Sequence, residues 1–210
     1  MIKLSINIAV WNQEKLIVRA LDSVPRRNDV EVVVYNDGST DNTLAVLRQY
    51  KKDNPDLNIR IYTDNVNRGV AHAANVLLEK CKGEYFCGLG SDDYIDTEKY
   101  CELIDGINGE DVICFDLRIN DGSVWKLRED TNRLYCGQSL RFIRKAFVDG
   151  LRFPENVKAG SDWYFNEELL KRNPVTKYTC AVAYYYNFPR DGSLVNLRAR
   201  GLISDEDLSP

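Results

Sequence analysis

The segment Glu31-Val-Val-Val-Tyr-Asn-Asp-Gly-Ser-Thr-Asp-Asn-Thr43 decides the fold that the sequence predicts. Residues 30–35 form a β-branched and aromatic run in which Glu31 is the single polar residue, and this indicates a strand covered on both faces. Leu44, Leu47 and Tyr50 then recur at helical spacing, up to a stop signal at 53–55. A buried strand that turns directly into a helix is typical of a mostly parallel sheet with helices on both faces.

The same alternation extends in both directions from this segment. The spacing of apolar residues predicts strands at 2–10, 59–62 and 85–89 and helices at 16–24, 44–53 and 70–81. Beyond Thr97 the order loosens, with helices expected near 98–107, 140–148 and 162–171 and strands at 112–120, 124–127 and 178–188. We find no internal repeat and no low-complexity linker, so one α/β domain over residues 1–210, with a loose acidic tail at 201–210, is predicted.

The composition is that of an ordinary soluble protein, with 44% apolar and 29% charged residues. A net charge of −4 gives no general attraction to nucleic acid or anionic lipid, so such a role would need a local basic patch. No apolar run approaches the roughly 20 residues that span a bilayer, and the first residues lack the pattern of a signal peptide. Six scattered cysteines without a C-x-x-C pair argue against a zinc or redox site. We therefore expect a cytoplasmic chain.

Three copies of Asp-Gly-Ser occur, at 37–39, 121–123 and 191–193, and Asp-Gly is an ordinary turn signal. In an open parallel sheet, ligands bind where strands end and the chain turns into the next helix. Only Asp37 stands between a predicted strand and a predicted helix, and this makes it a candidate site residue. The copy at 121–123 separates two strand-like runs, which predicts a hairpin turn.

A second candidate is Gly88-Leu-Gly-Ser-Asp-Asp-Tyr94, again at the end of a strand. Adjacent carboxylates repel, and a divalent cation such as Mg²⁺ or Mn²⁺, bridging them to a substrate phosphate, would relieve the repulsion. The competing interpretation is that Ser91 and Asp92 cap the next helix.

The third candidate, Gly160-Ser-Asp-Trp-Tyr-Phe165, opens a helix. Asp162 is either a helix cap or a general base beside the apolar rings of Trp163 and Tyr164. The single histidine, His72, lies in a helical stripe and is expected to be a packing or surface residue. The sequence contains no G-x-S-x-G, P-loop or H-E-x-x-H motif.

The order of these pieces resembles glycosyltransferase family 2, the inverting enzymes of the GT-A fold. The resemblance covers roughly residues 3–195. The stretches that carry it are S-I-N-I-A-V-W-N at 5–12, V-V-V-Y-N-D-G-S-T-D-N-T at 32–43, N-R-G-V-A-H-A-A-N at 67–75, G-S-D-D at 90–93, G-S-D-W at 160–163 and Y-Y-Y-N-F-P-R-D-G-S at 184–193.

The resemblance implies a nucleotide-sugar donor, most often a UDP-sugar, bound mainly by residues 1–96, with the acceptor bound by residues 97–200. Asp37 would bond the base and Asp162 would be the catalytic base. Asp93, with Asp92, would hold Mn²⁺ or Mg²⁺. Trp163 would contact the acceptor. The remaining implied contacts to the nucleotide sugar are Ala9, Trp11, Asn12, Asn67, Arg68, Gly69, Asn75, Ser91, Asp92 and, from the tail, Arg190 or Ser193.

Several positions depart from the family's pattern. Asn36, Gly90 and Ser161 each replace an acidic residue, whereas Ala9 stands for Pro and Ala74 for Arg. Because Asp93 and Asp162 are kept, we expect an active enzyme with altered donor contacts.

Two other classes compete with a transferase. One is a catalytically silent sugar-nucleotide or glycan-binding module. The other is a nucleotidyltransferase, which the missing glycine- and lysine-rich loop after the first strand disfavours. Glycan or lipid-linked acceptors are the default that the resemblance implies, with peripheral membrane contact. Protein, small-metabolite and nucleic-acid acceptors stay open, as does the oligomeric state.

Overall fold

The computed structural model describes residues 1–127, 141–157 and 160–188. Its strands are β1 (Leu4–Val10), β2 (Val30–Asp37), β3 (Ile59–Asp64), β4 (Tyr85–Gly88), β5 (Tyr94–Ile95), β6 (Val112–Ile119), β7 (Val124–Trp125), β8 (Arg141–Arg144) and β9 (Thr176–Tyr186). Its helices are α1 (Ile17–Asp22), α2 (Thr43–Asp53), α3 (Val70–Lys80), α4 (Thr97–Asp105), the short 3-10 helix η2 (Lys145–Val148) and α5 (Ser161–Lys171).

The strands form one sheet in the order β3-β2-β1-β4-β8-β6-β9-β5, with β7 paired to β6. The first four strands are parallel, and β1 lies between β2 and β4 in the register Asn7 to Val33 and Asn7 to Gly88. The antiparallel strand β8 joins this half to the second one, in which β6 and β9 are parallel. The predicted α/β class with a largely parallel central sheet is confirmed.

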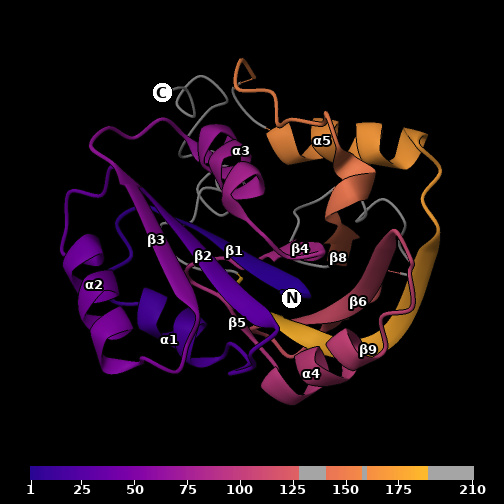
Figure 1. Ribbon diagram of the computed structural model, residues 1–210, viewed down its shortest axis with the longest axis horizontal. Coiled ribbons are helices and arrows are strands. Elements are labelled where there is room, and N and C mark those ends of the chain that lie inside the picture. The colour runs from indigo at the N-terminus through magenta and orange to yellow at the C-terminus, as the bar shows by residue number, and fades with distance from the viewer. Residues whose placement is uncertain (128–140, 158–159, 189–210) are drawn as a thin grey trace.

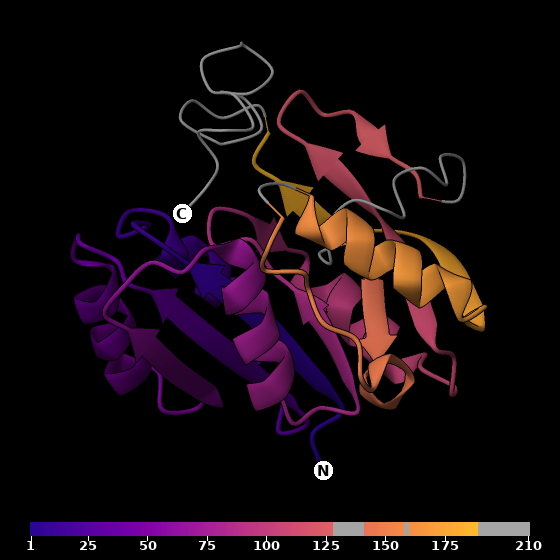
Figure 2. The ribbon, with the colours of Figure 1, turned by 90° about the horizontal axis from the view of Figure 1, so that it is seen from above.

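Helices cover both faces of the sheet. In Figure 1, α3 and α5 lie along one side of the sheet, whereas α1, α2 and α4 lie along the other; Figure 2 shows α3 and α5 neighbouring each other again. All eight residues of β2 are buried, as its run of valines predicts for a strand covered on both faces. Each fully buried Val, Leu or Ile contributes about 1.5–3 kcal/mol, so the apolar side chains between the sheet and its helices stabilise this arrangement.

One predicted element is wrong. The segment 140–148 was expected to be helical; Leu140 lies outside the described residues, and 141–148 forms strand β8 followed by a single 3-10 turn. Arg141–Arg144 pairs with β4 on one side and β6 on the other, and those ladder hydrogen bonds override the helical spacing of its apolar residues. The two-residue strand β5 was not predicted, because it is too short to leave a pattern.

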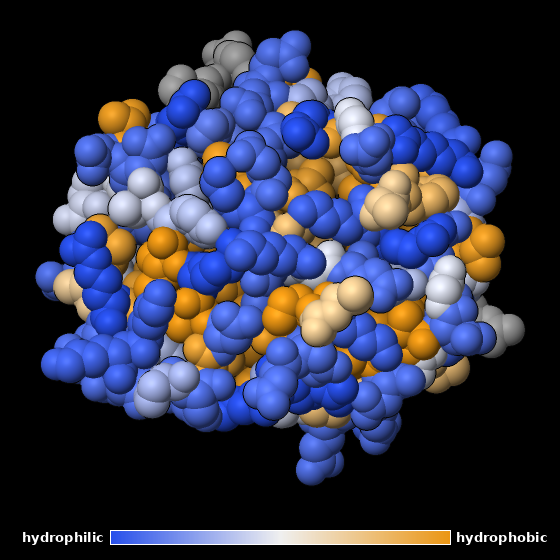
Figure 3. All heavy atoms as spheres, viewed as in Figure 1, coloured by the Kyte–Doolittle hydropathy of each residue, from blue (hydrophilic) through white to orange (hydrophobic). Residues whose placement is uncertain are grey.

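The turn at 120–123 is the hairpin turn that the sequence predicts. Gly122 has a positive φ of 87°, its N–H donates to the carbonyl of Ile119, and β6 and β7 pair on either side. Within the described ranges, none of the helices has both the length and the apolar character needed to span a bilayer. Figure 3 shows a mostly hydrophilic face on which apolar side chains occupy several small areas.

Candidate functional site

Three neighbouring strands end at one edge of the sheet, and a predicted motif follows each of them. In the order β2-β1-β4, β2 ends at Asp37, β1 leads into Trp11, and β4 leads into Leu89. Parallel strands bring their carboxyl ends together, so segments far apart in the sequence meet here.

Asp37 is 4% exposed, and its carboxylate faces the loop that precedes α3. One oxygen accepts a hydrogen bond from the N–H of Arg68 at 2.9 Å and the other accepts from Gly69 at 2.8 Å. The N–H of Gly69 also reaches Asn67 Oδ1 at 3.0 Å. A carboxylate offers about four acceptor positions, so Asp37 can shape this loop and still accept one bond from a ligand.

Gly38 lets this loop approach the turn after β2. Its φ is +65°, and a Cβ added there would lie 2.5 Å from the backbone of both Val66 and Asn67. No side chain fits at that distance, so glycine is required here for space as well as for conformation.

Asn12 ties the end of β1 to the same turn. Its Oδ1 accepts from the N–H of Thr40 at 2.8 Å, its Nδ2 donates to Thr40 Oγ1 at 3.2 Å, and its own N–H donates to Ser39 Oγ at 3.0 Å. Asn12 therefore positions this turn, and the nucleotide contact expected of it stays a prediction. Trp11 is instead 51% exposed at this edge.

The carboxylate of Asp93 is directed inward, and the residue is only 4% exposed. Its Oδ2 accepts a hydrogen bond from the Tyr184 hydroxyl, and its Oδ1 accepts from the N–H of Asn187 at 2.8 Å. The N–H of Gly90 donates to the same hydroxyl at 2.9 Å. The expectation that Asp93 holds a metal does not match this geometry, because both of its oxygens point to β9 and the residues after it.

The same geometry accounts for Gly90, which stands where the resembling motif has aspartate. A Cβ at position 90 would overlap the Asp93 carboxylate. Burial, followed by the neighbouring Asp92 carboxylate, raises the pKa of Asp93 to about 6. These hydrogen bonds therefore hold the 90–93 turn against β9, although burial makes the Asp93 carboxyl harder to ionise.

Asp92 lies on the other side of this turn and lines a cavity of about 500 Å³. The other walls come from β1 (Asn7 and Ala9), α3 (Val70, Ala74 and Leu77), residues 88–91 after β4, Phe153, and the start of α5 at 160–162. The cavity thus brings together two of the predicted carboxylates, Asp92 and Asp162, and the predicted residues Ala9 and Ser91. Asn7 and Phe153 were missed, although a polar residue inside the buried run of β1 was a signal for the first.

Asp162 stands in the first turn of α5, after Gly160 in the left-handed conformation. Its carboxylate at this end complements the helix dipole, and its position on the cavity wall allows it to reach a ligand. Trp163 and Tyr164 follow it and are 45% and 50% exposed. The structure therefore presents two aromatic rings to solvent directly beside the candidate base.

Asn75 holds the segment 153–155 against α3. Its Oδ1 accepts from the N–H of Phe153 at 2.8 Å, while its Nδ2 donates to the Phe153 carbonyl at 2.9 Å and to Glu155 Oε1 at 2.8 Å. His72 reaches Glu155 as well, with Nδ1 3.2 Å from Oε2. Asn75 thus positions the cavity wall, and the donor contact expected of it stays a prediction; His72 lies on the helix as a packing residue, one of the two roles that the sequence suggests.

The side chains that line the cavity fit a metal ion that is bound partly by the protein and partly by a bound substrate. Among the described residues no cluster of three or more His, Cys, Asp or Glu side chains could hold a metal ion. Asp92 supplies one half-buried carboxylate on the cavity wall. Mg²⁺ and related hard cations are commonly held by one or two carboxylates together with substrate phosphates, and one carboxylate here is compatible with that pattern.

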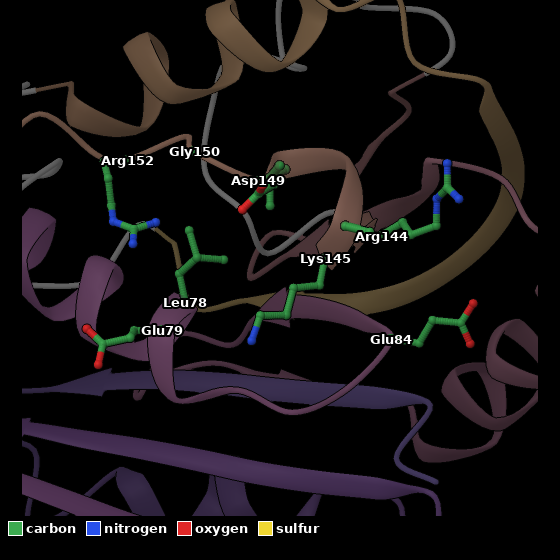
Figure 4. Close-up of a pocket in the computed structure, with 10 residues that line it drawn as sticks. Leu78, Glu79, Glu84, Arg144, Lys145, Asp149, Gly150 and Arg152 are labelled. Carbon is green, nitrogen blue, oxygen red and sulfur yellow. The ribbon is translucent and has the colours of Figure 1, made fainter.

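A larger cavity, of about 690 Å³, lies elsewhere, between the end of α3 and the segment 144–152 (Figure 4). Its basic side chains are already engaged: Arg144 pairs with Asp111, and Lys145 donates to the carbonyl of Cys81. It contains none of the predicted motif residues, so its volume does not make it the site. Arg190 and Ser193 lie outside the described residues.

Comparison with known proteins identifies the family of the chain. The sequence model of Glycosyl transferase family 2 matches residues 5–173. The chain is 29% identical over 206 residues to a teichoic acid poly(glycerol phosphate) polymerase of Staphylococcus epidermidis, covering 89% of this chain and 28% of that protein. It is 28% identical over 212 residues to a poly(ribitol-phosphate) beta-glucosyltransferase of Bacillus spizizenii, covering 90% and 33%.

Solved structures share the fold. S. aureus TarS 1–349 in complex with UDP-GlcNAc matches with a TM-score of 0.78 and 25% identity, over 91% of this chain and 60% of that chain. The mannosyltransferase PcManGT of Pyrobaculum calidifontis, in complex with GDP-Man and Mn²⁺, matches with a TM-score of 0.73 and 18% identity, over 98% and 68%. The chain spans about a third of the length of the curated relatives that it matches.

Proposed function

The chain belongs to glycosyl transferase family 2, and from this premise we propose that it is an inverting glycosyltransferase that moves a sugar from a UDP-sugar to an acceptor hydroxyl. Family membership confirms the resemblance drawn from the motifs. One observation carries the proposal: Asp92 and Asp162, which are 70 residues apart in the sequence, line one cavity at the carboxyl ends of the parallel strands.

Asp162 is proposed as the general base. It would take the proton of the acceptor hydroxyl while the hydroxyl oxygen forms a bond to the anomeric carbon of the donor. The bond between that carbon and the diphosphate breaks on the opposite face, and the nucleoside diphosphate leaves with the electron pair. The position of Asp162 on the cavity wall supports this role.

The nucleotide is proposed to lie along the edge formed by Ala9, Trp11 and the loop 67–69. The half-exposed Trp11 ring offers a face on which a base can stack. Asp37 holds the N–H groups of Arg68 and Gly69 in place and has acceptor positions left for the base.

Asp92, with Ser91 beside it, is proposed to hold Mn²⁺ or Mg²⁺ together with the donor diphosphate. When bound, such a cation neutralises the negative charge that develops on the leaving diphosphate. Asp93 would support this arrangement only indirectly, through the hydrogen bonds that keep the 90–93 turn against Tyr184.

The acceptor is proposed to be a glycan or polyol-phosphate chain, because two matched relatives are named for poly(ribitol-phosphate) and poly(glycerol phosphate). The exposed rings of Trp163 and Tyr164 offer apolar faces beside Asp162 on which a sugar or polyol unit can lie. Contact with a membrane surface would be peripheral. A cytoplasmic location is proposed because the described cysteines (81, 87, 101, 114 and 180) are free thiols.

Asp162→Asn tests the catalytic role. We expect transfer from UDP-sugars in the presence of Mn²⁺ to fall by about 10²–10⁴-fold, with the affinity for UDP unchanged. Glu167→Gln, one turn further along α5 and paired with Lys171, is the matched control and should keep its activity. A wild-type chain that binds UDP-sugars but neither transfers nor hydrolyses them would favour the silent binding module, and failure to bind any UDP-, GDP- or dTDP-sugar would overturn the proposal.

A further inference from the structure

The wall of the 500 Å³ cavity contains a buried amide that the proposed reaction has not used. Asn7 lies in the middle of β1 between Ile6 and Ile8, and it is only 6% exposed. Among the described residues, its Oδ1 is one of six buried side-chain atoms without a hydrogen-bond partner. A buried acceptor without a donor is costly, so a polar residue in this strand calls for a partner from outside the chain.

The fold directs this amide into the cavity. Side chains alternate along a strand, so Asn7 and Ala9 share the face of β1 that packs against α3. The register partner of Asn7 in β4 is Gly88, which has no side chain, and Ala74 of α3 is also small. These small residues leave the space that the cavity occupies.

One atom of this amide carries the argument. The thiol of Cys81 donates to the carbonyl of Leu78, so it is not a donor to the amide. Oδ1 of Asn7 is the atom left without a partner, and an amide oxygen is an acceptor only.

The cavity wall combines apolar and polar side chains. Leu77 and Phe153 line it and are buried, each 4% exposed. Ser91, Asp92, Ser161 and Asp162 line it as well, and they include the two carboxylates of the proposed reaction. A ligand group that fills this cavity and satisfies Asn7 must therefore combine one hydrogen-bond donor with an apolar surface.

We propose that Asn7 is a specificity-determining residue that selects a donor sugar with an acylamino substituent. The N–H of that substituent donates to Asn7 Oδ1, its methyl group packs against Leu77 and Phe153, and its carbonyl oxygen faces the serine side of the cavity. A sugar hydroxyl fits less well, because its lone pairs would lie against apolar walls. The inference rests on the proposed function and names the substrate class of the same cavity.

The test compares the affinity of the chain for UDP-N-acetylglucosamine, UDP-glucose and UDP, each with Mn²⁺, by titration calorimetry. We expect the wild-type chain to prefer the acetamido sugar by about tenfold or more. Asn7→Leu should bring that preference close to one, leave the affinity for UDP unchanged and raise the Tm, because it removes an unpaired buried acceptor. An unchanged preference in a folded Asn7→Leu chain would overturn the inference.

Ala74→Leu provides a second test on a different element. The larger side chain narrows the cavity from α3, so it should weaken binding of the acetamido sugar about tenfold more than binding of UDP-glucose. If Asn7→Leu does not fold, this variant decides, and equal losses for the two sugars would count against the inference. Failure of the wild-type chain to bind or turn over any UDP-sugar would instead refute the proposed function, so the two failures are distinguishable.

Discussion

The two described copies of Asn-Asp-Gly-Ser allow one glycine to be compared with another in the same chain. Gly38 and Gly122 both have a positive φ, of 65° and 87°. A Cβ at Gly122 would meet nothing within 4 Å, whereas one at Gly38 would lie 2.5 Å from the backbone of Val66 and Asn67. Replacing each glycine with alanine therefore separates the cost of the backbone conformation from the cost of crowding.

The expected magnitudes follow from these surroundings. Both variants place a Cβ in the left-handed region, at a cost of about 1–2 kcal/mol. Gly38→Ala must in addition displace the loop 66–69 and weaken the two hydrogen bonds that Asp37 accepts from Arg68 and Gly69. Hydrogen bonds to a charged group contribute about 1.5–3 kcal/mol each, so a total loss of about 3–5 kcal/mol is expected for Gly38→Ala.

Urea unfolding, followed by tryptophan fluorescence, measures the stability of both variants, and titration with UDP measures their affinity for the nucleotide. We expect Gly122→Ala to bind UDP as the wild-type chain does and Gly38→Ala to bind it at least about tenfold more weakly, because the loop beside Trp11 moves. Equal losses of stability, together with unchanged UDP binding by Gly38→Ala, would refute this account of the loop.

Three further predictions concern residues that position the site. Burial, followed by a neighbouring carboxylate, raises the pKa of Asp93 from 3.8 to about 6, so its contribution to stability is present below about pH 4 and is lost as the pH rises through about 6. The free energy of unfolding of Asp93→Asn, measured relative to wild type in the presence of a chelator, should rise by about 2 kcal/mol from about pH 4.5 to about pH 7.5. A difference in unfolding free energy that does not change with pH would contradict this. Tyr184→Phe should lower the free energy of unfolding by about 1–3 kcal/mol, whereas Tyr185→Phe, which keeps its ring stacked on a neighbouring tyrosine, should change it by less than about 0.5 kcal/mol. Asn75→Ala should make the segment around Phe153 exchange its amide hydrogens faster and weaken sugar-nucleotide binding, and unchanged exchange there would show that Asn75 does not hold the cavity wall.

Much of the first half of the fold could be predicted from local patterns. The β-branched run 30–35 and the helical stripe of α3 are strong periodic signals, and the structure places elements there within a few residues. The segment 141–144 could not be predicted in this way, because its strand exists only through pairing with β4 and β6. Which strands a segment pairs with is a property of the assembled sheet. A short apolar run is by itself compatible with a helix or with a strand.

The site shows the same division. The rule that ligands bind at strand ends singled out Asp37 and Asp92 from sequence, and it excluded the copy of the motif at 120–123. It could not tell which of two adjacent carboxylates faces the cavity, since Asp93 turns inward only because Tyr184 and Asn187 lie beside it. It likewise could not show that Asn75 holds Phe153, because the two residues are 78 positions apart in the sequence.

The sequence by itself determined the α/β class, the order of most of its strands and helices, and the edge of the sheet where the chemistry is proposed. Those properties depend on periodicity and on the residues at strand ends, which are local. Only the tertiary structure decided the direction of Asp93, the small residues that open the cavity, and the unpaired Oδ1 of Asn7 in its wall. These features arise from contacts between segments about 80 to 90 residues apart, such as Asn7 with Gly88 and Asp93 with Tyr184, and no local pattern encodes such contacts.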